Sequence, residues 1–131
     1  MSYLGTNNSM SEFSYAVRLA QKLIQCPSVT PEEAGTLDLL EVELKRIEFT
    51  CTRLIFGEGK KRIDNLYAEY GVGPAHFAFA GHVDVVPIGR LEDWRFSPFQ
   101  AEINDGFLFG RGSADMKSGI AAFISAIAIF S

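Results

Sequence analysis

The 131 residues are enough for one folded domain with a core, and the 47% hydrophobic content excludes a disordered chain. Twelve Lys and Arg residues face sixteen Asp and Glu residues, which gives a net charge of −4. The sequence has no basic stripe of the kind that neutralises phosphates, so we expect no nucleic-acid partner.

The sequence also argues against export and membrane insertion. The N-terminus "MSYLGTNNSMSEF" has no basic region followed by an apolar one, as a secretory signal would. The longest uncharged apolar run, 120–130, is much shorter than the roughly 20 residues of a transmembrane helix. We therefore expect a soluble, cytoplasmic protein with no membrane contact.

The first third of the chain predicts two amphipathic helices. Ser9 and Glu12 match a capping box, and apolar residues then recur at helical spacing until the helix ends before Pro27. The stretch "TPEE" repeats the start signal, with Thr30 as N-cap and Glu33 reaching back to it. The leucines that follow mark the buried face of the second helix.

The middle of the chain predicts three strands. They are "TCTRLIF" (50–56), "NLYAEYG" (65–71) and "HFAFAG" (76–81). Because 77–80 are apolar on both faces, we expect the third strand to be central in one sheet and covered on both sides. Two helices followed by three strands predict an α/β layered domain.

The last third predicts a hairpin and a helix that needs cover. Asn104, Asp105 and Gly106 have the chemistry of a hairpin turn, and a helix is expected from about Lys117. Residues 120–130 are apolar nearly all round, which is typical of a helix covered on every side. We expect another copy of the chain to bury this helix, or the chain to be the N-terminal piece of a longer protein.

The motif "GHVD" places a histidine and an aspartate at the end of the third strand. Open α/β sheets bind ligands there, and a metal-binding imidazole usually donates its second N–H to a carboxylate, so His82 and Asp84 together favour a metal site. His76 lies about 20 Å earlier on the same strand and is expected to be structural. Asp115, which precedes the last helix, is either a metal ligand or an N-cap.

Three motifs, "GHVDVVPIG", "DWRFSPF" and "GRGSADMKSGIAAF", resemble the dinuclear zinc aminoacylase and peptidase family that contains carboxypeptidase G2 and acetylornithine deacetylase. The resemblance runs from about Phe13 to the end. It implies a layered zinc-peptidase-like catalytic domain with a central mixed sheet flanked by helices, incomplete at its C-terminal side. Residues 1–10 would then be an extension and 11–131 the N-terminal part of the catalytic domain. The rest of that domain and a dimerisation domain would be absent.

The resemblance also implies a role for each site residue. His82 would be a ligand to one of two zinc ions, Asp115 would bridge both, and Asp84, counted among the catalytic residues, would orient His82. Cobalt is a possible replacement for zinc. The general base and the remaining ligands are expected outside this chain, so we expect the chain alone to be inactive.

Within the family, "CPSVTPEEAG" (26–35) and "GRGSADMKSG" (110–119) most resemble enzymes of lysine and peptidoglycan biosynthesis. These are homodimers that hydrolyse an N-succinyl amino-acid substrate, N-succinyl-LL-2,6-diaminopimelate, to succinate and LL-2,6-diaminopimelate. Two alternatives stay open. One is acetylornithine deacetylase or another amidohydrolase or carboxypeptidase of the family, and the other is a non-catalytic interaction module that uses the final helix.

Overall fold

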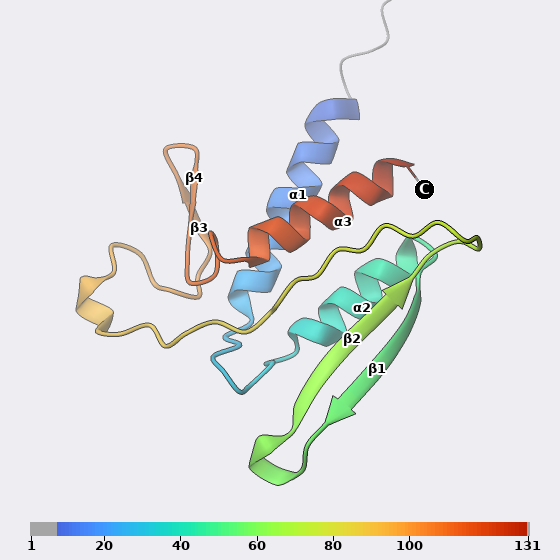
Figure 1. The fold of residues 1–131 in the computed structure, drawn as a ribbon. Coiled ribbons are helices and arrows are strands. Elements are labelled where there is room, and N and C mark those ends of the chain that lie inside the picture. Colours follow the sequence, from blue (N-terminus) through green and yellow to red (C-terminus); the bar gives the residue numbers. More distant parts are fainter. Residues whose placement is uncertain (1–7, 131) are drawn as a thin grey trace, which may run out of the picture.

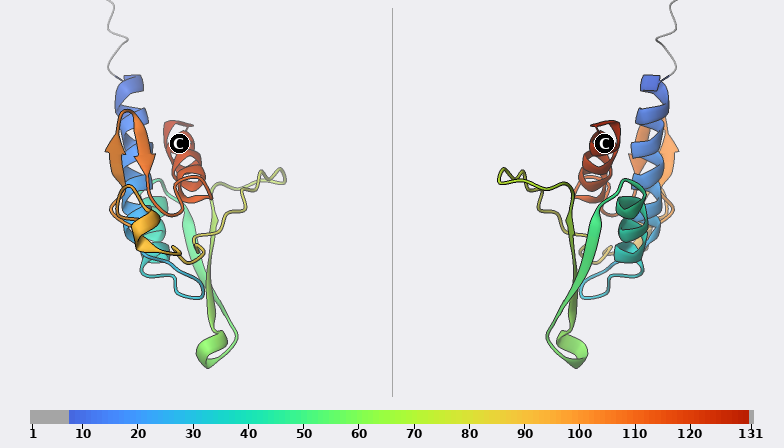
Figure 2. Two further views of the ribbon diagram at one scale, coloured as in Figure 1. Left: turned by 90° about the vertical axis from the view of Figure 1, so that its left-hand side faces the viewer. Right: turned by 90° about the vertical axis from the view of Figure 1, so that its right-hand side faces the viewer.

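The computed structural model describes residues 8–130, which form three helices and two small sheets. The order is α1 (Asn8–Gln25), α2 (Thr36–Arg46), β1 (Thr50–Phe56), β2 (Ile63–Glu69), β3 (Glu102–Asn104), β4 (Phe107–Phe109) and α3 (Lys117–Phe130), with short 3₁₀ turns at Gly59–Lys61 and Leu91–Asp93. In Figure 1, α3 crosses α1, and α2 lies along the β1–β2 hairpin. The side views of Figure 2 place α1 and α2 on one side of that hairpin.

The core forms where the three helices meet, and α1 packs directly on α3. Each helix contributes apolar residues at helical spacing, so each presents one apolar stripe to the other two. The buried cluster consists of Leu19, Ala20, Leu23, Leu37, Leu40, Leu44, Ile120, Ala121 and Ile124. The predicted helices and the leucine face of the second one are confirmed.

The second helix begins later than the sequence predicts. It starts at Thr36, because Ala34 and Gly35 adopt positive φ angles of 51° and 79° that a right-handed helix cannot contain. Thr30 is therefore not its N-cap. Glu33 does cap the helix, since its carboxylate accepts a hydrogen bond of 3.0 Å from the main-chain N–H of Leu37.

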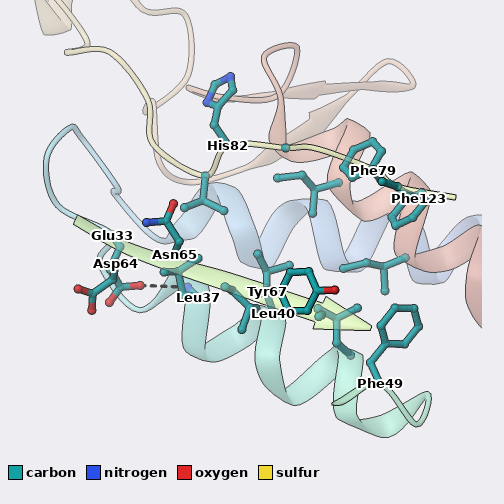
Figure 3. Close-up of a pocket in the computed structure, with 18 of the residues that line it drawn as sticks. Glu33, Leu37, Leu40, Phe49, Asp64, Asn65, Tyr67, Phe79, His82 and Phe123 are labelled. Atoms are coloured by element: carbon teal, nitrogen blue, oxygen red, sulfur yellow. Dashed lines mark hydrogen bonds between the residues drawn. The ribbon is translucent and has the colours of Figure 1, made fainter. Parts of the chain in front are cut away.

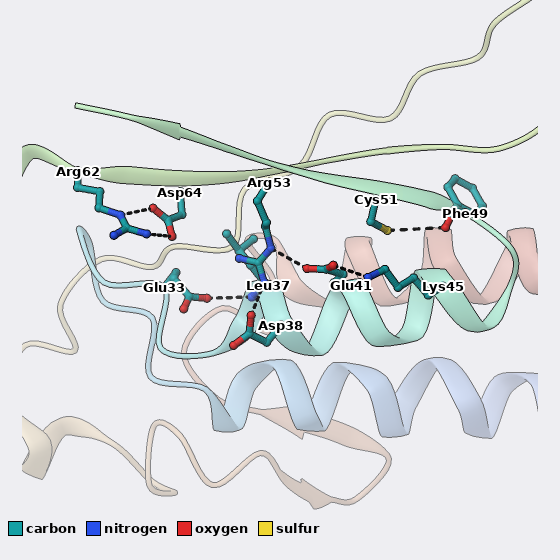
Figure 4. A network of polar contacts seen from close by, with 10 residues as sticks. All are labelled: Glu33, Leu37, Asp38, Glu41, Lys45, Phe49, Cys51, Arg53, Arg62 and Asp64. Atoms are coloured by element: carbon teal, nitrogen blue, oxygen red, sulfur yellow. Dashed lines mark hydrogen bonds and ion pairs between the residues drawn. The ribbon is translucent and has the colours of Figure 1, made fainter. Parts of the chain in front are cut away.

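The β1–β2 hairpin is antiparallel and is fastened to α2 by charged side chains. The register runs from the pair Thr50 and Glu69 to the pair Phe56 and Ile63, so the second strand starts two residues before its predicted position. Arg53 donates to Glu41 over 2.9 Å and also pairs with Asp38, both on α2 (Figure 4). These contacts hold the hairpin against the helix layer.

The β3–β4 hairpin also forms where the sequence predicts it. Its turn residues Asp105 and Gly106 have φ angles of 51° and 80°, a conformation that Asp tolerates and Gly adopts freely. The chain then returns to the helices and enters α3 at Lys117 as expected.

The prediction that 76–81 is a central strand is wrong for the residues that the structure describes. This segment is extended, but it pairs with no strand, and the sheets are two separate antiparallel pairs in place of the expected mixed sheet. Phe77 is 86% exposed, whereas Phe79 stacks on Phe123 of α3 at a ring distance of 4.2 Å. The apolar residues of this segment do pack against a neighbouring element, but that element is the helix α3 and not a strand of a sheet. The α/β class itself is confirmed.

The final helix is covered on one face from within the chain. Ile120, Ala121 and Ile124 are buried in the core, whereas Ile129 and Phe130 at the helix end are 50% and 89% exposed. The sequence analysis left the cover of this helix to another copy or to further chain, whereas α1 covers one face of it within the described residues.

The predicted N-terminal extension, 1–10, lies mostly outside the described residues, although α1 already begins at Asn8. The side chains of the predicted capping box, Ser9 and Glu12, also lie outside what the structure describes. Among 8–130, no helix combines the length and apolar character needed to cross a bilayer.

The α1–α3 interface predicts unequal effects for two substitutions in the same helix. Ile124→Ala should lower the free energy of unfolding by about 2–5 kcal/mol, because it leaves a cavity in the buried interface. Ile129→Ala, at an exposed position, should cost less than about 1 kcal/mol. Urea unfolding of the two variants measures the difference, and equal losses would contradict this packing.

Candidate metal centre

His82 and Asp115 come together from segments 33 positions apart in the chain. His82 follows the extended segment 76–81, and Asp115 lies in the turn before α3. The imidazole Nε2 lies 3.0 Å from Asp115 Oδ1. The convergence predicted from the two motifs is confirmed as geometry.

The other ring nitrogen of His82 faces Asp84. Nδ1 lies 3.0 Å from the main-chain carbonyl oxygen of Asp84 and 3.3 Å from its carboxylate Oδ1. A carbonyl oxygen can only accept, so Nδ1 carries the proton and Nε2 is the nitrogen available to a metal. The sequence predicted the contact of His82 with the Asp84 carboxylate but missed the contact with the Asp84 main-chain carbonyl.

The surroundings favour a charged imidazole. The Asp84 carbonyl raises the pKa of His82, partial burial opposes this, and the Asp115 carboxylate raises the pKa further. In the metal-free protein, the ring can then donate from both nitrogens. A metal ion at Nε2 must displace the proton there, so metal binding releases a proton.

The pair His82 and Asp115 fits a zinc ion in chemistry and spacing. Imidazole nitrogen and carboxylate oxygen are common zinc ligands, and two such atoms on a tetrahedral ion lie about 3.3 Å apart. The observed 3.0 Å needs only a small outward movement. Their side chains are 48% and 84% exposed, so the side facing solvent is open to further ligands.

Two ligands do not complete a zinc site. Catalytic zinc usually has three protein ligands plus water. Within the part of the chain that the structure describes, no group of three or more His, Cys, Asp or Glu side chains is arranged to hold a metal. Asp84 is turned toward Nδ1, away from the Nε2 side where a metal would bind.

The His82 segment lies directly on α3 because Gly81 has no side chain. A Cβ at this position would lie 3.1 Å from Ile120 Cγ1 and 3.0 Å from a ring carbon of Phe79. The main-chain N–H of His82 contacts Met116 Sδ at 3.4 Å. The Asp115–Met116 peptide is cis.

A large cleft opens beside His82 (Figure 3). It has a volume of about 1200 Å³ and lies between β2, the segment 75–84 and the helices α2 and α3. Its walls combine polar side chains with apolar and aromatic ones, among them Leu40, Tyr67, Phe79 and Phe123, and His82 lies at one edge. His76 lies in the same exposed segment and lines this cleft, with no contact to His82 among the described interactions.

Arg111 is a neighbour of the site that the sequence interpretation overlooked. It lines a smaller cavity of about 220 Å³ together with His82, Asp84 and Asp115. Its guanidinium lies 4.9 Å from the Trp94 ring centre and donates to the carbonyl of Pro87 over 3.2 Å. Arg111 thus connects the loop that contains "DWRFSPF" to the turn that carries Asp115. The sequence feature that could have identified Arg111 is its position in the motif "GRGSAD", four residues before Asp115.

The chain is similar in sequence to known proteins. Residues 78–131 match the sequence profile of peptidase family M20/M25/M40. The chain is 55% identical over 116 residues to the succinyl-diaminopimelate desuccinylase of Beijerinckia indica, and 56% identical over 111 residues to that of Rhodospirillum rubrum. These alignments cover 88% and 84% of this chain but only 30% and 28% of the relatives, so the chain spans less than a third of their length.

The fold has a match among solved structures. Human carnosine dipeptidase 1 superimposes with a TM-score of 0.81 at 23% identity, over 93% of this chain and 29% of that one. At this identity, the likeness supports the fold alone. It agrees with the layered arrangement expected from the sequence.

A two-ligand site predicts weak metal binding by the 131-residue chain. Calorimetric titration with zinc should show weak, poorly defined binding, which His82→Ala or Asp115→Ala abolishes because each removes one of two ligands. Asp105→Asn, an exposed change in the β3–β4 turn, should bind as the unmodified chain does. Tight stoichiometric binding would instead require a complete site within these residues.

Proposed function

We propose that this chain belongs to peptidase family M20/M25/M40 and is the N-terminal part of a metal-dependent amide hydrolase. The reaction is hydrolysis of N-succinyl-LL-2,6-diaminopimelate to succinate and LL-2,6-diaminopimelate. The contact between His82 Nε2 and Asp115 Oδ1 carries the proposal. It brings together two potential metal ligands from the motifs "GHVD" and "GRGSAD", both within the matched segment. The identity to desuccinylases over most of the chain supports the choice of substrate.

The rest of the active site comes from the remainder of the parent protein. The relatives are more than three times as long as the aligned segment, which leaves room for the general base, the other metal ligands and a dimerisation domain. The exposed cleft beside β2 and the unpaired segment 76–81 support this, since both present apolar surface that further chain would cover. This chain alone is expected to be inactive.

His82 and Asp115 would bind the metal ions of the site. These would be two zinc ions, or cobalt in place of zinc. Bound metal ions lower the pKa of a water molecule and polarise the scissile carbonyl. His82 binds through Nε2, while the Asp84 carbonyl keeps the Nδ1 proton and fixes the ring orientation. Asp115 Oδ1 contacts His82 Nε2 in the metal-free protein, and the side chain is 84% exposed, so the carboxylate can be approached by cations from solvent.

The substrate is a small molecule with an N-succinyl group. The acidic balance of the chain gives no support for nucleic-acid binding. The parent protein works as a cytoplasmic homodimer and does not contact a membrane. The absence of a membrane-spanning helix among 8–130 is compatible with this.

Kinetics of the full-length protein test this function. Hydrolysis of N-succinyl-LL-2,6-diaminopimelate should be metal-dependent, and His82→Ala or Asp115→Asn should lower kcat/KM by at least about a thousandfold, because each removes a metal ligand. Asp84→Asn should cost about 10–100-fold, as changes to groups that orient a ligand do. Asp105→Asn makes the same chemical change as Asp115→Asn at an exposed turn and should leave kcat/KM unchanged.

The same assay distinguishes the alternatives. Preferred turnover of N-acetylornithine would identify a deacetylase of the family. A full-length protein that binds no metal and hydrolyses neither substrate would contradict the proposal and favour an interaction module.

We also expect the exposed end of α3 to be covered by another copy of this chain. Ile129 and Phe130 form an apolar surface next to the cleft, which Phe130 also lines. Replacing both with Lys should make the 131-residue chain more monomeric in light scattering. Val42→Lys, at an exposed position on α2, should leave its association unchanged. Ile124 is unsuitable for this test, because it is buried in the core of the same chain.

A further inference from the structure

Lys117 has a buried amino group that takes no part in the proposed metal binding or amide hydrolysis. Its side chain is 0% exposed, and Nζ donates to the main-chain carbonyls of Leu23 and Cys26, each over 2.7 Å. Burial lowers the pKa of Lys117 to about 8. A buried ammonium group is costly even when it is hydrogen-bonded. A methionine of similar length would fill the same space at lower cost, so the charge needs an explanation.

The two carbonyls that Lys117 binds belong to the end of α1. The last carbonyls of a helix lack partners within the helix and carry the negative end of its dipole. α1 ends at Gln25, so the ammonium caps it from the first residue of α3. The main-chain N–H of Lys117 also donates to Gly112 over 2.9 Å and closes the turn that carries Asp115. Asp115 is thereby attached to the end of α1.

The His82 segment is attached to the same stretch of chain through Ser28. The Ser28 hydroxyl is fully buried and donates to the carbonyl of Val83 over 2.6 Å. The main-chain N–H of Val85 donates to the Ser28 carbonyl over 2.8 Å, and Thr30 N–H donates to Val85 over 3.1 Å. Of the bonded residues, Val83 directly follows His82, and Val83 and Val85 lie on either side of Asp84.

The two attachments meet at Gly112. A Cβ there would lie 2.9 Å from Val85 Cγ1 and 3.0 Å from Lys117 Cδ, so the side chains of Val85 and Lys117 leave no room for it. Gly112 also has a φ of 89°, which favours glycine. Residues 23–30, here called the frame, therefore hold both segments in one tightly packed arrangement.

We propose that Lys117 and Ser28 are positioning residues, which fasten the Asp115 turn and the His82 segment to the frame and so set the distance between the two metal ligands. Neither residue touches the ligand atoms. The relevance to metal binding rests on the proposed function, whereas the positioning itself concerns only this chain. Removing either attachment lets one ligand move relative to the other.

The test uses the full-length protein. Lys117→Met keeps the apolar stem and removes the donors, and Ser28→Ala removes a single hydroxyl, which keeps the test valid if Lys117→Met does not fold. Crystal structures of the metal-free variants should show the contact between His82 Nε2 and Asp115 Oδ1 opened from its 3.0 Å. Titration with cobalt, followed by its visible absorption, should show affinity lowered about 10–100-fold and an altered spectrum.

Leu40→Ala is the matched control for general destabilisation. It removes buried side-chain volume from α2, away from both attachments, and should lower the melting temperature while cobalt affinity and spectrum stay unchanged. An equal loss of cobalt affinity in Leu40→Ala would overturn the positioning role. So would Lys117→Met and Ser28→Ala proteins that keep the 3.0 Å contact and bind cobalt normally. Failure of the unmodified protein to bind cobalt would contradict the proposed function, and the crystal structures would still decide the positioning.

Discussion

The packing of α1 on α3 is the contact on which the rest of this structure depends. It joins Leu19 and Leu23 to Ile120 and Ile124, about a hundred positions along the chain. Everything between the helices, including α2, both hairpins and the His82 segment, is a closed loop that begins and ends at this contact (Figure 1). The loop-closure entropy is lost once, and the short contacts at the helix ends then form at little further cost.

The parts of the fold that the sequence predicted are those that local pattern decides. Helical spacing identified α1, α2 and α3, and turn chemistry identified the β3–β4 hairpin. The start of α2 was missed, since the positive φ of Ala34 is a non-glycine exception that composition does not show. The segment 76–81 failed for another reason. Its apolar residues indicate that both faces pack against other parts of the protein. They do not indicate whether a strand lies beside the segment to pair with it.

The candidate site divides in the same way. His82, Asp84 and Asp115 were predicted because their motifs carry chemistry within a few residues, and the structure brings the three side chains together. Lys117 was passed over, because its partners lie 94 and 91 positions away at the end of α1. A sequence pattern contains no sign of such a contact. The same is true of Arg111, whose packing on Trp94 joins two loops that look independent in the sequence.

The unpaired segment beside the cleft has a consequence for local stability. Among the described residues, the main-chain amides of 76–81 have no carbonyl acceptor. By contrast, the amide of Val85 donates to Ser28 over 2.8 Å and that of Thr30 donates to Val85 over 3.1 Å. We therefore expect amide hydrogens of 76–81 to exchange with solvent faster than those of Val85 and Thr30, whose exchange requires these bonds to open. Within one extended stretch, the boundary between fast and slow exchange is then expected near His82, so the candidate metal ligand lies between unbonded and bonded main chain.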